Sequence, residues 1–116
     1  MSENDCLFCK IAGGDINAEK VFESDEVIAF RDINPQASTH VLIIPRRHIA
    51  TINDVTETDR DLLGSLYLVA ARIAAEEGIA EDGYRVVMNC NAAAGQTVFH
   101  IHLHLLGGRD FSWPPG

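Results

Sequence analysis

His100-Ile101-His102-Leu103-His104 places an imidazole at every second position, with one apolar residue between each pair. Alternate side chains of a β-strand point to the same face of a sheet, so this spacing predicts one strand with two unlike faces. The three histidines line one face, and the leucines and isoleucine between and after them point into a core. We therefore expect a strand that buries one face and carries out chemistry on the other.

The strand spacing also limits what the histidines can do together. Side chains two positions apart on a strand lie about 6.6 Å apart, so one metal ion could bind two of these histidines but hardly all three. Imidazole can act as a nucleophile, a proton carrier or a zinc ligand near neutral pH. We therefore expect the three to have different roles. The alternative is a surface strand whose histidines pair with each other or with carboxylates.

The length and charge of the chain restrict the classes of function. With 116 residues, we expect a single domain, 1–116, that buries about two-thirds of its unfolded surface and has a C-terminal tail at 109–116. Nine basic and seventeen acidic residues give a net charge of −8, which opposes binding to nucleic acid, although a small phosphate ligand remains compatible.

The N-terminus has no basic stretch followed by an apolar one, and the most apolar run, 66–75, contains Arg72 and is too short for a membrane span. We expect a cytoplasmic protein with no membrane partner.

The order of hydrophobic patterns predicts the architecture. Two short β-prone runs at 20–24 and 27–31 flank a turn-prone Ser-Asp-Glu, and a buried strand at 40–45 ends at proline. Apolar residues recur at helical spacing over 56–78, and two further strands are expected at 84–89 and 100–106. These elements predict an α+β fold, with an antiparallel sheet of about five strands and one long helix packed on it.

Two other segments carry residues that suit chemistry. Cys6 and Cys9 have the C-x-x-C spacing with which two thiolates bind one tetrahedral metal, but a single pair is half a site. The pair could also be a redox couple or two ordinary small residues, and Cys90 is expected to be a buried or free thiol. The loop 89–97 is rich in small residues and could cradle a phosphate with its backbone amides, or it could be an ordinary turn.

Several segments together resemble the histidine-triad nucleotide-binding family, and its Hint branch in particular. The resemblance is carried by Gly95-Gln-Thr-Val-Phe-His-Ile-His-Leu-His-Leu-Leu-Gly-Gly108, Phe8-Cys-Lys-Ile11, Phe30-Arg-Asp-Ile-Asn-Pro-Gln-Ala37, Thr39-His-Val-Leu-Ile-Ile-Pro45 and Trp113-Pro-Pro-Gly116, in that family's order. They span nearly the whole chain. The resemblance implies a homodimer that binds a purine nucleoside monophosphate, AMP or GMP, and hydrolyses P–N bonds of nucleoside 5′-monophosphoramidates.

The resemblance also implies roles for individual residues. His102 matches the nucleophile that forms a nucleotidyl-histidine, while His104 and His40 match positions that contact the phosphate or support the nucleophile. One of the latter two assists proton transfer to the leaving amine. The other matched positions are phosphate contacts at Asn89, Gly95, Gln96 and Thr97, a ribose contact at Asp32, a base slot of Phe8, Ile11, Phe30 and Ile33, and a leaving-group contact at Trp113.

In family members with the cysteine pair, a structural zinc is held by four residues that correspond to Cys6, Cys9, His48 and His100. No organic cofactor is implied. Three other functions stay open: a dinucleoside polyphosphate hydrolase, a nucleotide-binding regulatory module with vestigial catalysis, and a metalloenzyme that uses the triad for a catalytic zinc.

Overall fold

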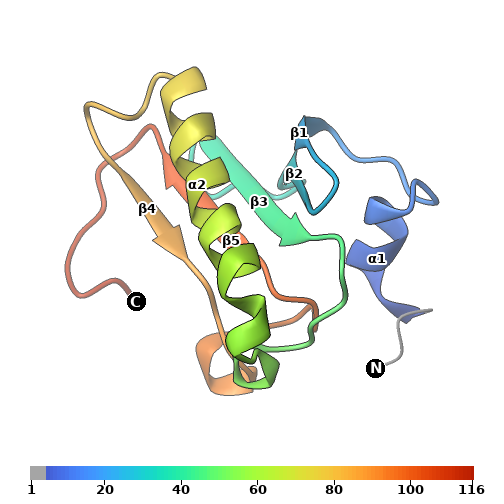
Figure 1. Ribbon diagram of the computed structural model, residues 1–116. Helices are drawn as coiled ribbons and strands as arrows, with labels where there is room; N and C mark the ends of the chain where they lie inside the picture. Colours follow the sequence, from blue (N-terminus) through green and yellow to red (C-terminus); the bar gives the residue numbers. More distant parts are fainter. Residues whose placement is uncertain (1–4) are drawn as a thin grey trace.

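A computed structural model describes residues 5–116 as one sheet with helices on both faces (Figure 1). The five strands lie in the order β1-β2-β3-β5-β4, and every neighbouring pair is antiparallel. The elements are α1 (Leu7–Ala12), β1 (Lys20–Glu23), β2 (Val27–Arg31), β3 (Thr39–Pro45), α2 (Arg60–Glu76), β4 (Tyr84–Val87) and β5 (Leu103–Gly107), with short 3₁₀ turns at 52–54, 57–59 and 92–94. The predicted fold class is confirmed.

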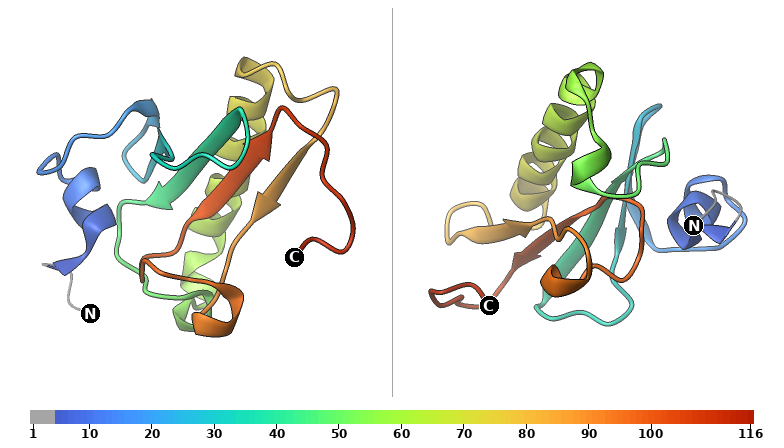
Figure 2. Two further views of the ribbon diagram at one scale, coloured as in Figure 1. Left: turned by 180° about the vertical axis from the view of Figure 1, so that it is seen from behind. Right: turned by 90° about the horizontal axis from the view of Figure 1, so that it is seen from below.

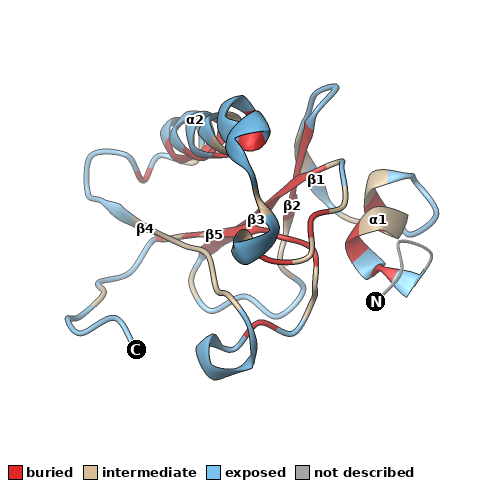
Figure 3. Ribbon diagram, turned by 60° about the horizontal axis from the view of Figure 1, so that its bottom comes forward, coloured by how far each residue is buried: buried red, intermediate tan, exposed pale blue. Residues whose placement is uncertain are grey.

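Helix α2 covers one face of the sheet because both surfaces carry apolar residues at matching periods. Alternate residues of β3 and β5, such as Val41, Ile43 and Leu105, pack against the helix stripe that includes Leu66 and Ile73. Figure 3 shows the buried side of α2 facing the sheet and its exposed side facing solvent. No helix within residues 5–116 is long and apolar enough to cross a membrane.

The second face of the sheet is covered by α1, which the sequence patterns did not predict. Its buried residues Phe8 and Ile11 pack against Phe30 of β2 and against Leu42 and Ile44 of β3. The sheet thus lies between α1 and α2 (Figure 2). Helix α1 has only six residues, which is too short to show a helical period, and Cys6 caps it by accepting a hydrogen bond from the Cys9 N–H.

The triad strand begins later than predicted. Its pairing with neighbouring strands starts at Leu103, and the segment with His100 and His102 is extended chain before β5, where the Ile101 N–H donates to the Ile49 carbonyl at 2.8 Å. The alternation nevertheless continues through it, because Ile101 is buried in the α2-facing core together with the leucines of β5. His104 shares the opposite face with Leu42, its partner on β3.

Two other predicted boundaries also move inward. The predicted helix 56–78 begins at Arg60, because Thr56 and Asp59 form a capping box in the preceding turn. The predicted strand 84–89 ends at Val87, where its pairing with β5 stops.

Candidate active site and metal cluster

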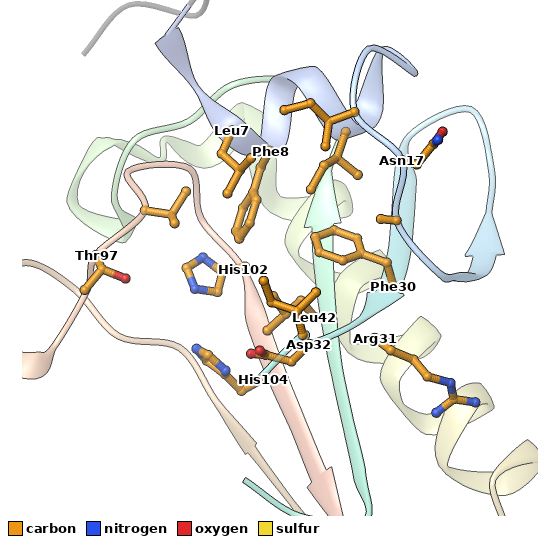
Figure 4. Close-up of a pocket in the computed structure, with 15 residues that line it drawn as sticks. Leu7, Phe8, Asn17, Phe30, Arg31, Asp32, Leu42, Thr97, His102 and His104 are labelled. Carbon is orange, nitrogen blue, oxygen red and sulfur yellow. The ribbon is translucent and has the colours of Figure 1, made fainter. Parts of the chain in front are cut away.

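A cavity of about 320 Å³ opens between α1 and the sheet face that carries the histidines (Figure 4). That volume falls in the range of small-molecule sites. Eight of the residues predicted for the site line it: Phe8, Ile11, Phe30, Asp32, Ile33, Thr97, His102 and His104. The sequence patterns had not indicated the other lining residues, Leu7, Ile16, Asn17, Ala18, Arg31, Leu42 and Val98, most of which are apolar residues without a distinctive motif.

The inner wall of the cavity is aromatic. The rings of Phe8 and Phe30 meet edge to face with centroids 5.5 Å apart, and both side chains are almost fully buried. Ile33 lies at the rim with its side chain completely exposed. An apolar slot with one uncovered apolar residue at its mouth suits a flat ligand that would bury that residue.

His102 presents one ring nitrogen to the cavity with its lone pair free. Its Nδ1–H donates to the His100 carbonyl at 2.8 Å, and a carbonyl can only accept, so the neutral ring carries its lone pair on Nε2. The Phe8 ring meets the His102 ring edge to face at 5.0 Å. Burial lowers the pKa of His102 from its usual 6.5, outweighing its hydrogen bond to the His100 carbonyl. The imidazole is therefore neutral, which is the form that can attack an electrophile.

His40 and His104 form a short hydrogen-bonded chain next to His102, whose ring meets that of His104 at 4.9 Å. The Gln36 N–H donates to His40 Nδ1 at 3.0 Å, so the His40 proton lies on Nε2, which is 2.9 Å from His104 Nδ1. His104 then accepts at Nδ1 and carries its own proton on Nε2. Burial is the main cause that lowers the pKa of His104 to about 4, and the neighbouring His102 and His40 contribute to the same lowered value. Burial also lowers the pKa of His40.

The positions of these protons argue against a metal ion bound by Asp32, His40 and His104. Ligand atoms of Asp32, His40 and His104 lie within 4.8 Å of one another, which alone would suit a cation. However, His40 Nε2 carries a proton that points to His104 and, at 3.4 Å, to the Asp32 carboxylate. A hydrogen-bonded cluster accounts for this geometry without a cation.

A different cluster has the donors of a zinc site. Cys6, Cys9, His48 and His100 bring one ligand atom each to within 4.8 Å of the others. Cys6 Sγ lies 3.3 Å from His100 Nδ1, and Cys9 Sγ lies 3.3 Å from His48 Nδ1 and 3.4 Å from His100 Nδ1. Tetrahedral zinc holds sulfur and nitrogen ligands about 3.5 Å apart, so the set fits that ion closely.

The outer contacts of this cluster also fit a metal. The His100 Nε2–H donates to the Pro45 carbonyl at 2.7 Å, which leaves Nδ1 as the nitrogen that faces the cysteines. Metal-binding histidines commonly donate their second ring N–H to a carbonyl in this way. The residues predicted for zinc are therefore brought together by the fold, and their chemistry suits that ion.

The predicted phosphate loop reaches the cavity only through Thr97 and the adjoining Val98. Gln96 is buried and braces the loop: its carboxamide accepts from the Asn91 N–H and donates to the carbonyls of Ala50 and Val98. Gly95 has a φ of 91°, a conformation that glycine adopts without strain. Asn89 is half-buried and does not line the cavity.

Trp113 lies outside this cavity, with 83% of its side chain exposed. The tail before it is anchored by Phe111, over whose ring the guanidinium carbons of Arg109 and Arg85 lie at 4.3 and 5.2 Å. Arg109 also donates to the Gln36 carbonyl at 2.9 Å. The sequence patterns assigned no role to Gln36 or Arg109, because the contacts that join them to each other and to His40 use the Gln36 backbone, which leaves no motif.

The three histidines of one extended run have three different places. His102 is neutral and faces an apolar cavity, His104 belongs to the hydrogen-bonded chain with His40, and His100 belongs to the Cys/His cluster. This arrangement defines a histidine-triad type of site. The chain belongs to the HIT family, whose domain model matches residues 13–111.

Similar proteins with assigned names or solved structures support that placement. The purine nucleoside phosphoramidase of Escherichia coli K12 is 55% identical over 103 residues, which cover 89% of this chain and 87% of that one. An uncharacterised HIT-like protein of Synechococcus elongatus is 51% identical over the full length of both chains. The crystal structure of a HIT family hydrolase from Legionella pneumophila superposes with a TM-score of 0.95 at 59% identity, covering 97% of this chain and 100% of that one.

Proposed function

We propose that this protein is a purine nucleoside phosphoramidase, which hydrolyses the P–N bond of nucleoside 5′-monophosphoramidates such as AMP joined to an amine. The observation that carries the proposal is the His102 ring, which is neutral and directs its Nε2 lone pair into a cavity with an aromatic inner wall. The E. coli relative with that activity is 55% identical. Its named activity requires a nucleophile or activated water at phosphorus, and His102 is suited to be the nucleophile.

In the first step, His102 Nε2 attacks the α-phosphorus, an N–P bond forms, and the P–N bond to the amine breaks. The leaving amine takes up one proton, and the histidine ring becomes a positively charged nucleotidyl-imidazolium that keeps its Nδ1–H. That proton is held by the His100 carbonyl at 2.8 Å, so the positive charge forms beside a carbonyl dipole. The contact orients the ring before attack and stabilises it afterwards.

In the second step, water attacks phosphorus, an O–P bond forms, and the bond from phosphorus to His102 Nε2 breaks. The nucleoside monophosphate leaves, His102 is restored as a neutral imidazole, and water releases the proton that balances the one taken up earlier. His104 lines the cavity with its N–H on Nε2, so we assign it a hydrogen bond to the phosphoryl oxygens or to the departing nitrogen. His40 does not line the cavity, and we assign it to supporting His104. Such donors stabilise charge that develops in the transition state.

The remaining predicted contacts are assigned by position. Phe8, Ile11, Phe30 and Ile33 would enclose the purine, and the Asp32 carboxylate would accept hydrogen bonds from the ribose hydroxyls. Thr97 would donate to the phosphate, while Asn89, Gly95 and Gln96 would shape the loop that brings Thr97 there.

We further propose that Cys6, Cys9, His48 and His100 hold a structural zinc ion. The ion would fix α1 to the triad segment and leave His102 free, because the His100 ring is used by the cluster and only its carbonyl touches the nucleophile. The cytoplasmic location predicted from the sequence remains a prediction.

We propose that the protein acts as a homodimer. Strand β4 is at one edge of the sheet, and α2 leaves Leu68 and Tyr67 exposed by 73% and 55%. Association of two chains through the β4 edge and the exposed side of α2 would cover these apolar side chains and would allow the exposed Trp113 to approach the partner's cavity. Light scattering coupled to size-exclusion chromatography tests it: a mass of one chain at micromolar concentration would reject the dimer.

The function is tested by release of AMP from an adenosine 5′-phosphoramidate. We expect turnover by the intact protein and a loss of at least about a thousandfold in His102→Ala, with the folded state of the variant checked by its melting curve. Intact-mass analysis of a quenched reaction should detect an AMP adduct that the variant lacks. Faster hydrolysis of a diadenosine polyphosphate than of the phosphoramidate would instead assign the protein to polyphosphate hydrolysis, and AMP binding without any turnover would make it a binding module.

A further inference from the structure

The His40 ring is held by a backbone contact that the proposed chemistry does not itself explain. Gln36 follows Pro35 in the connection between β2 and β3, and its N–H donates to His40 Nδ1 at 3.0 Å. The other end of the same residue is also held, because Arg109 Nε–H donates to the Gln36 carbonyl at 2.9 Å. Arg109 lies after β5, so a residue of the C-terminal segment holds the loop between β2 and β3, and that loop orients His40.

Two glycines before Arg109 allow its contact with the Gln36 carbonyl. A Cβ atom on Gly107 would overlap Ile79, and one on Gly108 would overlap the Ser38 hydroxyl. Gly108 also has a φ of 89°, which glycine adopts readily. The absence of side chains lets the chain pass close to Ile79 at Gly107 and close to Ser38 at Gly108, and the next residue, Arg109, reaches the Gln36 carbonyl. Stacking of Arg109 on Phe111 at 4.3 Å then fixes the guanidinium plane.

We propose that Arg109 is a positioning residue for the reaction, acting through Gln36 and His40 to decide which nitrogen of His104 carries the proton. This proposal rests on the proposed function for its catalytic consequence. The Gln36 N–H can only donate, so it keeps His40 Nδ1 free of a proton and places the His40 proton on Nε2. That proton points to His104 Nδ1 at 2.9 Å and leaves an N–H, not a lone pair, on His104 Nε2.

The consequence concerns the cavity directly, because His104 lines it and Arg109 does not. An N–H facing the substrate attracts phosphoryl oxygens, whereas a lone pair would repel them. If the Gln36 contact is lost, His40 can hold its proton on Nδ1, and the chain of donors to His104 reverses. Arg109 should thus affect the chemical step while leaving the nucleotide contacts intact.

The test compares Arg109→Ala with Arg85→Ala. Both arginines lie over the Phe111 ring, and Arg85 also anchors the tail by donating to the Ser112 carbonyl, but only Arg109 reaches Gln36. ¹⁵N shifts of the imidazole nitrogens report the tautomer directly. We expect Nε2–H for His40 in the intact protein and in Arg85→Ala, and a substantial Nδ1–H population in Arg109→Ala.

With the phosphoramidate substrate, Arg109→Ala should lower kcat by about tenfold with little change in KM, the size expected when one supporting hydrogen bond is lost. Arg109→Lys, which retains a donor, should recover part of both effects. If Arg109→Ala fails to fold, Gln36→Pro removes the N–H that donates to His40 Nδ1 without altering Arg109, and it should shift the His40 tautomer in the same direction.

The proposal is overturned if His40 carries its proton on Nδ1 in the intact protein, or if folded Arg109→Ala retains the original tautomer. Where Arg109→Ala does not fold, retention of the original tautomer in Gln36→Pro overturns it. An intact protein that shows the expected tautomers but no phosphoramidate turnover would leave the positioning network in place and reject the proposed function instead. The two failures are therefore distinguishable.

Discussion

The His102 ring and the His100 carbonyl are joined by one hydrogen bond of 2.8 Å, so the residue that faces the cavity is held by the backbone of a residue in the Cys/His cluster. Phe8 reinforces the link, because it lies between the two cysteines in sequence and its ring meets that of His102 at 5.0 Å. The cluster and the cavity consequently share two short segments of chain. Any change that loosens the Cys/His cluster should therefore also disturb the cavity that His102 and Phe8 line.

Removal of the metal ligands should therefore reduce stability before it alters chemistry. We expect Cys9→Ser to lose bound zinc and to lower the melting temperature by on the order of 10 °C or more, as happens when a metal contributes to folding. Cys90→Ser is the matched control, since this cysteine lies outside the cluster, and it should change neither zinc content nor melting temperature appreciably. Equal melting curves for the two variants, with zinc supplied, would count against a structural metal.

A chelator separates this interpretation from a catalytic zinc. Treatment of the intact protein should lower the unfolding temperature and weaken AMP binding together, because the segment formed by α1 and its cap carries both cysteines and Phe8. A catalytic metal predicts the opposite order: turnover disappears while the unfolding temperature and AMP affinity remain unchanged. Thermal unfolding and calorimetric titration with AMP, each before and after chelation, measure the two quantities.

His104 should titrate far below an ordinary histidine. Burial is the main cause of its pKa of about 4, assisted by His102 and His40 and opposed by the Asp32 carboxylate. Since the folded pKa lies below the unfolded value of 6.5, the unfolded chain binds more protons between these pH values. The free energy of unfolding should thus be level above pH 6.5 and fall as the pH is lowered towards 4. NMR titration of the His104 ring checks the assignment, and a midpoint near 6.5 would contradict it.

The parts of this structure that the sequence predicted are those with a repeated pattern. Alternation through Ile101, Leu103 and Leu105 predicted which face of the strand holds the histidines, even though pairing begins only at Leu103. Helix α1 has six residues and no visible period, so it was missed, although its cysteines and Phe8 had been singled out from their motifs. Tertiary packing on Phe30 and Leu42, rather than local propensity, holds it in place.

The proton arrangement of the site was beyond prediction for a different reason. It depends on the Gln36 N–H, the His100 carbonyl and the Pro45 carbonyl, which are backbone groups of a kind that every chain carries. Only the fold determines which histidine each one meets. The sequence therefore supplied the reactive side chains, and the backbone assigns their tautomers.

Arg31 and Glu77 form a paired salt bridge from β2 to the end of α2, with N–O distances of 2.8 and 3.0 Å. The hydrogen bond from Arg31 is the main cause of a lowered Glu77 pKa. A carboxylate with a depressed pKa contributes stability above its unfolded value of 4.5, and the contribution disappears as the pH falls through the lower folded value. Because both groups are partly exposed, we expect Glu77→Gln to cost about 1 kcal/mol at neutral pH.

Urea unfolding at several pH values measures that difference. The gap between the intact protein and Glu77→Gln should be constant well above the unfolded pKa of 4.5 and should shrink as the pH falls below 4.5 and through the lowered folded value. Glu76→Gln is the control, since Glu76 pairs with Arg72 on the exposed face of α2 at 3.4 Å, and it should change stability by less than about 0.5 kcal/mol. A pH-independent gap for Glu77→Gln would show that packing rather than charge is responsible.

Gly108→Ala should destabilise the protein by about 1–3 kcal/mol, because its positive φ strains an alanine and the new methyl group would overlap the Ser38 hydroxyl. The double variant Ser38→Gly with Gly108→Ala removes the overlap but keeps the backbone strain, so it should recover only part of the loss.

Gly64→Ala is the opposite control. This glycine lies on the exposed face of α2 with no atom within 4 Å of an added Cβ, and the change should stabilise the protein by about 0.5–1 kcal/mol. Thermal unfolding of the three variants measures these differences, and a Gly108→Ala protein as stable as the original would mean that the close approach of the two chain segments is not required.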